Sequence, residues 1–201
     1  MKIVVWNILD LIDEYGEDST REVLSAFSCK REIAGESKSL NPDIEHFIKN
    51  NAIQFARQKV SVSYIVGDED DGAILGYFTI THKPVEMPAD GLSKTTMKTM
   101  SRYAELDTQK NSYLVSGFLI AQFGKNYAVD DGSRISGKEL MRLANKELCD
   151  LQHRAGGGIE YLDCEADAKL INFYEGEGFR LFGERISEKD GKRYLQYMRF
   201  F

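Results

Sequence analysis

The most constraining feature of the chain is one continuously apolar run in its middle. Residues 113–123 read YLVSGFLIAQF and contain no charged side chain. Such a run predicts a central strand that is buried on both faces. Gly117 inside it predicts a bulge or a close approach of two backbones. A polar, glycine-containing loop over 124–137 and a helix over 138–154 follow, and strand, loop, helix is the order of a phosphate-binding unit.

The segments on either side of this run predict a mixture of helices and strands. Apolar residues at three- and four-residue spacing predict one buried helical stripe after Pro42. Residues 83–111 show no clear period and are interpreted as an insert or lid. The other expected elements are helices over 11–27, 42–58 and 167–175, a strand over 159–165, and hairpins over 60–66 with 73–81 and over 179–186 with 193–201.

Composition narrows the class of protein. The chain has 201 residues, 42% of them apolar and only 3 of them proline, which is typical of a globular protein able to bury a sizeable core. No uncharged run is long enough to span a bilayer, and Asp10 and Asp13 interrupt the apolar N-terminus where a signal peptide would need a continuous apolar segment. We therefore expect a cytoplasmic protein that has no membrane partner.

Cysteine, histidine and charge patterns exclude several kinds of site. Cys29, Cys149 and Cys164 are too widely spaced for a disulfide framework or a four-cysteine zinc site, and we expect the last two to be largely buried. The three histidines show no metal-binding spacing, so no metal is expected. The 26 basic and 32 acidic residues give a net charge of −6, which disfavours nucleic acid as a partner.

The most specific motif is the run AKLINFYEGEGF at 168–179. It resembles the fourth-helix signature of the GNAT superfamily of N-acetyltransferases, in which an Asn-Phe-Tyr-Glu run in a helix precedes a Gly-Phe that opens the next strand. Leu170, Phe173 and Phe179 are expected to be core residues. The resemblance implies that Asn172 and Tyr174 contact the cofactor.

A second motif lies at the start of the helix after the central strand. In the GNAT superfamily a Gln/Arg-x-x-Gly-x-Gly/Ala segment holds the pyrophosphate of coenzyme A with backbone amides and the helix dipole. Here only Gly137 matches these glycines well. An ordinary capped helix, with Ser136 at the N-cap and Glu139 at the third position, is the alternative. The residues that the resemblance assigns to the pyrophosphate are Ser133, Arg134, Ile135, Ser136, Gly137 and Lys138.

The resemblance covers about residues 25–186 in family order. Segments such as FSCKREIA and ILGYFTI are similar to a branch that includes bacterial acetyltransferase toxins, although no glycine-rich, arginine-bearing loop is evident. It implies an α+β GNAT fold with a mixed, mainly antiparallel sheet whose fourth and fifth strands splay apart. The pantetheine arm would pair with the strand end at Ala121, Gln122 and Phe123, where Gly124 lets it approach. We expect one acetyltransferase domain over 1–201, with a helical extension over 1–40.

The activity that this resemblance implies is transfer of an acetyl group from acetyl-CoA to a primary amine by direct attack. Tyr174 would be the general acid for the departing thiolate. Glu165 is the one carboxylate considered as a base. The expected acceptor is a small amine or a peptide amine, and a homodimer is left open. Two alternatives stand beside this interpretation: a non-catalytic binding or structural protein with the same fold, and toxin-like acetylation of aminoacyl-tRNA.

Overall fold

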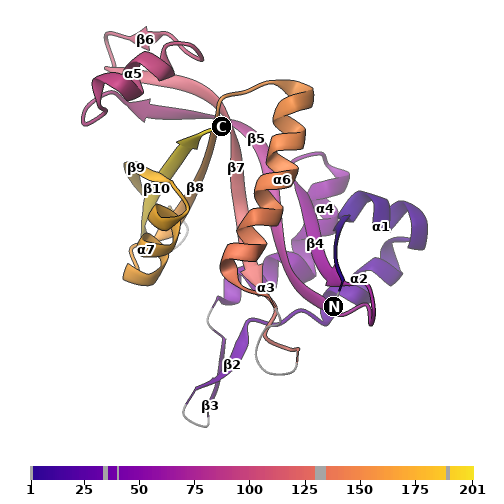
Figure 1. Ribbon diagram of the computed structural model, residues 1–201. Helices are drawn as coiled ribbons and strands as arrows, with labels where there is room; N and C mark the ends of the chain where they lie inside the picture. The colour runs from indigo at the N-terminus through magenta and orange to yellow at the C-terminus, as the bar shows by residue number, and fades with distance from the viewer. Residues whose placement is uncertain (1, 34–35, 40, 130–134, 189–190) are drawn as a thin grey trace. The chain divides into compact units, whose positions relative to one another are not determined.

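The computed structural model describes residues 2–33, 36–39, 41–129, 135–188 and 191–201, and its main feature is an eight-stranded sheet (Figure 1). A separate hairpin of β2 (Lys30–Ile33) and β3 (Glu36–Ser39) lies outside that sheet. A short β6 (Leu106–Asp107) pairs with β7. The order of the other strands is β1 (Ile3–Asn7), β4 (Val62–Asp68), β5 (Ile74–Pro88), β7 (Ser112–Lys125), β8 (Ile159–Glu165), β10 (Arg193–Phe200) and β9 (Arg180–Ile186).

Most neighbouring strands in the large sheet run antiparallel, as expected. β1–β4, β4–β5, β8–β10 and β10–β9 are antiparallel, whereas β7 and β8 are parallel. The register of the parallel pair consists of Phe118 opposite Glu160 and Leu119 opposite Tyr161. Gly117 permits this approach, because a Cβ there would lie 3.1 Å from the Tyr161 ring and 3.2 Å from the Ile159 carbonyl oxygen.

The helices are α1 (Ile8–Tyr15), α2 (Glu17–Ser25), α3 (Pro42–His46), the π-helical turn η1 (Phe47–Asn51), α4 (Ala52–Arg57), α5 (Lys94–Met100), α6 (Gly137–Ala155) and α7 (Ala168–Gly176). The chain divides into two compact units. Unit 1 contains Met1–Thr81 and Ala121–Glu147, and unit 2 contains His82–Ile120 and Leu148–Phe201.

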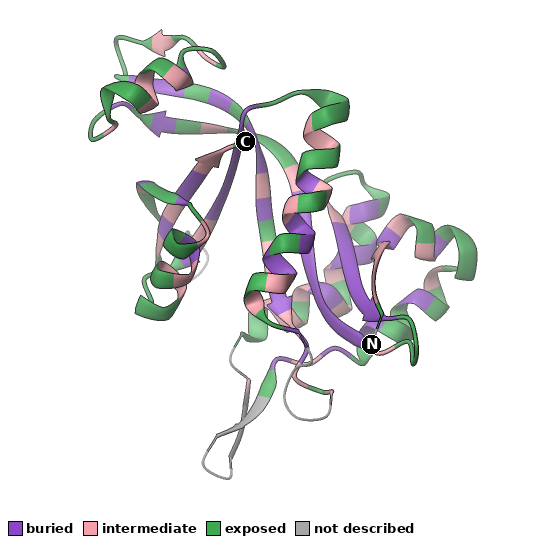
Figure 2. Cartoon of the chain, viewed as in Figure 1, coloured by how far each residue is buried: buried purple, intermediate pink, exposed green. Residues whose placement is uncertain are grey.

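Unit 1 is a helix–sheet–helix sandwich. Its main core joins α1, α2, η1 and α4 to one face of β4 and β5, where Ile65 and Tyr77 are buried. Gly76, the residue before Tyr77 on β5, faces α6 on the opposite side, because a Cβ on it would lie 3.3 Å from Leu140 Cδ2. Figure 2 shows the buried residues running along β4 and β5. Successive residues of β5 thus face opposite sides of the sheet, as a strand with helices on both faces requires.

Unit 2 packs the expected insert against its own strands. Met87 and Met100 from the insert lie in one buried cluster with Tyr113, Tyr161 and Met198. The insert is more regular than expected, because β5 continues to Pro88 and α5 follows with Ser93 as its N-cap. On α7, Tyr174 contacts the ring of Phe179 edge-on at 6.0 Å between centroids.

Two sequence-based expectations are wrong. The N-terminal 40 residues are not only helical, because β1 pairs with β4 and residues 30–39 contain the β2–β3 hairpin. The central strand is also not buried on both faces throughout, since Leu114 is 67% exposed and Ser116 is exposed. Both errors concern features that depend on which distant segments cover or pair with a strand.

Candidate active site

The C-terminal end of β7 carries the residues assigned to the pantetheine arm. Ala121 is exposed, Gln122 and Phe123 are partly exposed, and Gly124 is buried. A Cβ on Gly124 would lie 2.6 Å from Ile44 Cγ2 and 3.5 Å from Phe27 Cζ. Glycine is therefore needed here for packing in unit 1. A role in admitting a cofactor stays a prediction.

Asn126 fixes the chain immediately after this strand end. Its Oδ1 accepts hydrogen bonds from the backbone N–H of Ser28 at 2.8 Å and of Ala128 at 3.0 Å. Its Nδ2 donates to the carbonyl of Ile74 at 2.8 Å. Asn126 is 2% exposed; its bond to Ile74 is buried, and its bonds from Ser28 and Ala128 are partly buried.

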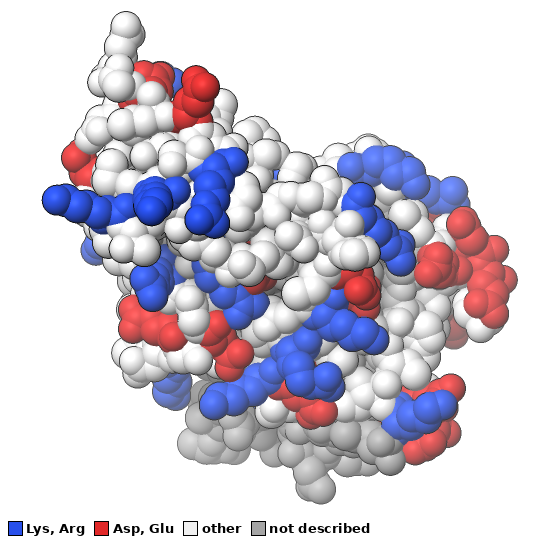
Figure 3. Space-filling model, turned by 45° about the horizontal axis from the view of Figure 1, so that its top comes forward, with Lys and Arg blue, Asp and Glu red and all other residues white. Residues whose placement is uncertain are grey.

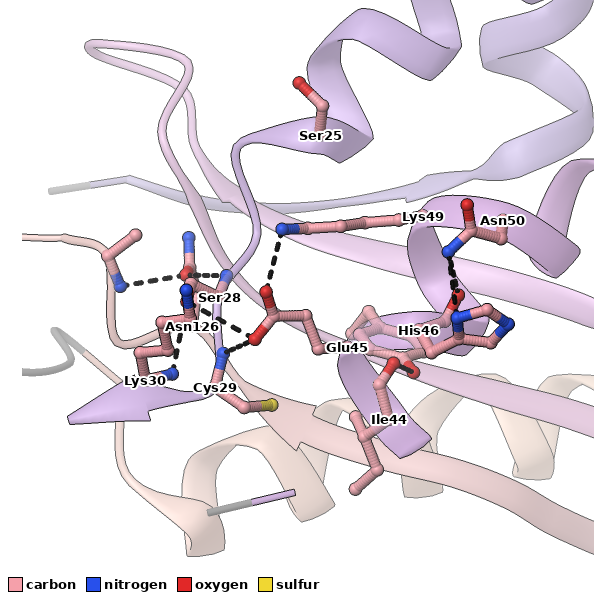
Figure 4. A network of polar contacts seen from close by, with 12 residues as sticks. Ser25, Ser28, Cys29, Lys30, Ile44, Glu45, His46, Lys49, Asn50 and Asn126 are labelled. Atoms are coloured by element: carbon pink, nitrogen blue, oxygen red, sulfur yellow. Dashed lines mark hydrogen bonds and ion pairs between the residues drawn. The ribbon is translucent and has the colours of Figure 1, made fainter. Parts of the chain in front are cut away.

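Glu45 of α3 joins the same network (Figure 4). One carboxylate oxygen accepts from the Cys29 N–H at 2.8 Å and from the Ser28 hydroxyl at 3.4 Å, and the other accepts from Lys49 Nζ at 2.8 Å. Burial alone would raise the pKa of the Glu45 carboxyl, but the bonds from Lys49 and Cys29 outweigh it and lower that pKa. Burial, followed by the charge of Glu45, raises the pKa of the Cys29 thiol to about 12, so this thiol is not a nucleophile.

The start of α6 carries part of the predicted pyrophosphate site. Ser136 is the N-cap, because its Oγ accepts from the Glu139 N–H at 3.1 Å and its carbonyl accepts from the Leu140 N–H at 3.0 Å. Gly137 and Lys138 then form the first turn, whose N–H groups have no partner within the helix. Ile135 is buried, at 1% exposure. Ser133 and Arg134 lie outside the described residues.

The helix α7 carries the other two predicted residues, in unit 2. It begins with Asp167, whose Oδ1 accepts from the backbone N–H of Lys169 at 2.8 Å and of Leu170 at 3.2 Å. This cap fixes the first turn. Asn172 is exposed, whereas Tyr174 is buried at 7% exposure.

Tyr174 is held as a neutral phenol. Burial, together with the nearby Cys164, raises its pKa above the usual value of about 10. Within the described residues no group hydrogen-bonds to its hydroxyl. A protonated phenol without a competing acceptor can give a proton or a hydrogen bond to a ligand.

The remaining candidates are less suited to chemistry. The Glu165 carboxylate accepts from Lys192 Nζ at 2.8 Å, so it takes a proton only by giving up this ion pair. Cys164 is buried as expected, but Cys149 is exposed, because it lies on the outward side of α6. Among the described residues no three His, Cys, Asp or Glu side chains are arranged to hold a metal ion.

The structure thus places the assigned residues in two groups. The β7 end and the start of α6 belong to unit 1, and Asn172 and Tyr174 belong to unit 2. Asn126 and Glu45 are the polar residues that sequence reasoning missed. An asparagine directly after a strand is a common turn former, but nothing in the sequence marks Ser28 and Ile74 as its partners.

No helix within the described ranges has the length and apolar character that crossing a membrane requires.

The fold has known counterparts, although sequence comparison finds none. No protein-family model matches the chain, and no curated protein is similar to its sequence. A mutant of the KacT toxin matches 98% of this chain and 95% of its own, with a TM-score of 0.62 and 14% identity. The AtaT toxin complexed with acetyl-methionyl-tRNAfMet matches 96% and 94%, with a TM-score of 0.61 and 13% identity.

A second AtaT structure extends the comparison to the whole chain. It is a tyrosine-to-phenylalanine mutant bound to the C-terminus of the antitoxin AtaR and to acetyl-CoA, and it matches 100% of this chain and 94% of its own. Its TM-score is 0.59 and its identity 13%. Identities this low show the fold alone. The chain has the GNAT fold that is found in the AtaT and KacT toxins, as the motifs predicted.

Proposed function

We propose that the protein is an N-acetyltransferase that moves the acetyl group of acetyl-CoA to a primary amine. The observation that carries the proposal is the match of the entire fold to a toxin solved with acetyl-CoA. The Asn-Phe-Tyr-Glu run of α7 adds to it, since both the fold and this motif point to the same cofactor.

The chemistry would follow from named residues. The amine nitrogen attacks the thioester carbon, the C–N bond forms and the C–S bond breaks, and the amine loses its proton to solvent. The departing thiolate takes the proton of the Tyr174 hydroxyl, which burial keeps protonated at neutral pH, and the phenolate then regains a proton from solvent. A backbone N–H at the end of β7, near Phe123, would stabilise the oxyanion. Asn172 would contact the cofactor.

The start of α6 would hold the pyrophosphate. The N–H groups of Gly137 and Lys138, which have no partner within the helix, and the positive end of the helix dipole would attract phosphate oxygens. The Ser136 Oγ uses its acceptor capacity for the helix cap, but its O–H proton can still be donated. Lys138 adds a positive charge, and Ser133 and Arg134 complete the proposed set.

The test is acetyl-CoA binding and turnover in the wild type and in Tyr174→Phe. A ligand at a hundredfold excess over its Kd adds about 2.7 kcal/mol of stability, which a thermal-shift assay detects. We expect Tyr174→Phe to keep this shift and to lose turnover, since the phenyl ring keeps the packing and lacks the proton. Tyr161→Phe, another buried tyrosine of unit 2, is the matched control and should keep turnover.

Two results would reject the proposal in different ways. A wild-type protein whose stability does not change with saturating acetyl-CoA favours the non-catalytic alternative. Full turnover in Tyr174→Phe rejects the assigned acid and leaves the activity in place.

Aminoacyl-tRNA is the second candidate acceptor, and two rows of basic residues favour it. Lys94, Lys98 and Arg102 are exposed at four-residue spacing along and just after α5. Lys138, Arg142 and Lys146 are exposed at the same spacing on α6. No side chain in the described ranges forms an ion pair with any of the six.

Because these cations are concentrated on and near two helices, the net charge of −6 does not exclude nucleic acid as a partner. Figure 3 shows several groups of Lys and Arg side chains on the face that it presents, with Asp and Glu side chains between them. Free cations at regular spacing are suited to a phosphate backbone. The AtaT structure with acetyl-methionyl-tRNAfMet makes RNA the acceptor to test first, ahead of small and peptide amines. We also propose a cytoplasmic location, where acetyl-CoA and these acceptors are available.

A further inference from the structure

We propose that Asn126 is a positioning residue: it holds the C-terminal end of β7 in the geometry that binds acetyl-CoA. The inference rests on the proposed function, because β7 is assigned to the cofactor there. The contacts that support it all lie within unit 1.

The first of these contacts are the hydrogen bonds of the Asn126 side chain. One amide group joins three backbone segments, because it accepts from Ser28 and Ala128 and donates to Ile74. The backbone N–H of Asn126 donates to the Leu75 carbonyl at 2.9 Å. These bonds fix the position of the chain at the point where β7 ends.

The segments that Asn126 joins are themselves fixed. The carbonyl of Ser28 accepts from the Tyr127 N–H at 2.8 Å, so the two segments are joined by backbone as well as by side chain. Glu45 holds the adjoining Cys29 N–H from α3. Gly124 packs against Ile44 of the same helix, which leaves no space for this part of β7 to shift toward α3.

The bonding pattern requires an amide at position 126. An aspartate would keep the acceptor for Ser28 and Ala128, but it would place a carboxylate oxygen against the Ile74 carbonyl in a buried site. An alanine would leave the part-buried N–H groups of Ser28 and Ala128 and the buried Ile74 carbonyl without this partner. Either change weakens the side-chain connection between the end of β7 and the rest of unit 1, while the backbone bonds to Leu75 and Ser28 remain.

The experiment compares the wild type with Asn126→Ala and with Thr20→Val. Thr20 is the matched control, because it is 2% exposed and its hydroxyl donates to the Gly16 carbonyl at 2.8 Å, in α2 and away from β7. Two quantities are measured for each protein: acetyl-CoA turnover with its KM, and hydrogen exchange of the amides over 123–128.

We expect Asn126→Ala to lower kcat/KM for acetyl-CoA by about a hundredfold, the effect of misplacing a reacting group by about 1 Å. Exchange over 123–128 should become faster in this variant, while β4 keeps its wild-type protection. Thr20→Val should change neither quantity beyond what its loss of stability explains.

The inference fails if Asn126→Ala binds and turns over acetyl-CoA like the wild type, or if its loss matches that of Thr20→Val. If Asn126→Ala does not fold, exchange in the wild type decides: slow exchange of the Ser28 and Ala128 amides supports the anchor, and fast exchange overturns it. A wild type that does not bind acetyl-CoA rejects the proposed function instead, which separates the two failures.

Discussion

Single atoms limit what the end of β7 can accommodate. At Gly124 a methyl group would meet Ile44 Cγ2 at 2.6 Å, closer than carbon atoms pack. Ile44 cannot withdraw freely, because its own carbonyl accepts from the Tyr77 hydroxyl at 2.7 Å. The packing of α3 on position 124 thus requires a glycine there.

Gly124→Ala should destabilise unit 1 by about 1–3 kcal/mol, the usual cost of overpacking a core. The clash should be relieved when Ile44→Ala is added, since this change removes the Cγ2 atom. We expect the double variant to be more stable than the sum of the single changes predicts, by about 1 kcal/mol. Denaturant unfolding of the four proteins measures the coupling. Strict additivity would show that the two positions do not meet.

How far the site could be predicted depends on the range of each interaction. The Ser136 cap and the close approach at Gly117 were correctly indicated, because a capping box and a glycine within a strand are local signals. The contacts of Asn126 reach 98 residues back to Ser28 and 52 back to Ile74. No local pattern encodes partners at such separations.

Whole helices and strands are likewise predictable where local signals define them and not where distant segments do. The helix after Pro42, the strand β8 and the helix α7 follow from apolar period and capping residues, and the structure has them within about two residues of the predicted ends. β1 was missed because its residues become a strand only by pairing with β4. The loop before α6 departs from the family pattern in sequence, and its middle lies outside the described residues.

One carboxylate, that of Glu45, hydrogen-bonds helix α3 to the segment before β2, so this contact should depend on pH. The pKa of Glu45 is lowered in the folded protein, against about 4.3 for an unperturbed glutamate. Such a group adds stability above its unfolded pKa and loses it as the pH falls through the folded pKa. Glu45→Gln should therefore be less stable than the wild type at pH 7, and the gap should narrow below about pH 4.

Denaturant unfolding of both proteins at pH 7 and pH 3.5 gives this gap directly. Glu17→Gln is a suitable control, because Glu17 pairs with Arg21 on the surface, where ion pairs contribute less than about 1 kcal/mol. A gap for Glu45→Gln that is equally wide at both pH values would contradict the assigned contact.

At the scale of the whole molecule, charge is distributed unevenly. Four consecutive acidic residues occupy 68–71, whereas α5 and the residues just after it carry three exposed cations and no acid over 94–102. A net charge is a sum over the chain and does not describe the field beside one helix. Binding of a polyanion is therefore a question about α5 and α6 and not about the total.

If RNA is the acceptor, replacing Lys94, Lys98 and Arg102 by glutamine should weaken tRNA binding and flatten its salt dependence. Each lost phosphate contact reduces the slope of log K against log salt by about 0.7–0.9. The control removes three cations from unit 1 (Arg21, Arg57 and Lys59), which gives the same net charge. Equal slopes for the two triple variants would show that α5 does not contact RNA.

The cap at Ser136 has a consequence for how this chain can evolve. The hydroxyl serves the helix as an acceptor and is proposed to serve a phosphate as a donor. Aspartate caps a helix as well as serine does, but its carboxylate would repel that phosphate. Selection for a stable helix alone would accept either residue, so a population that kept only serine at this position would reveal selection for the ligand.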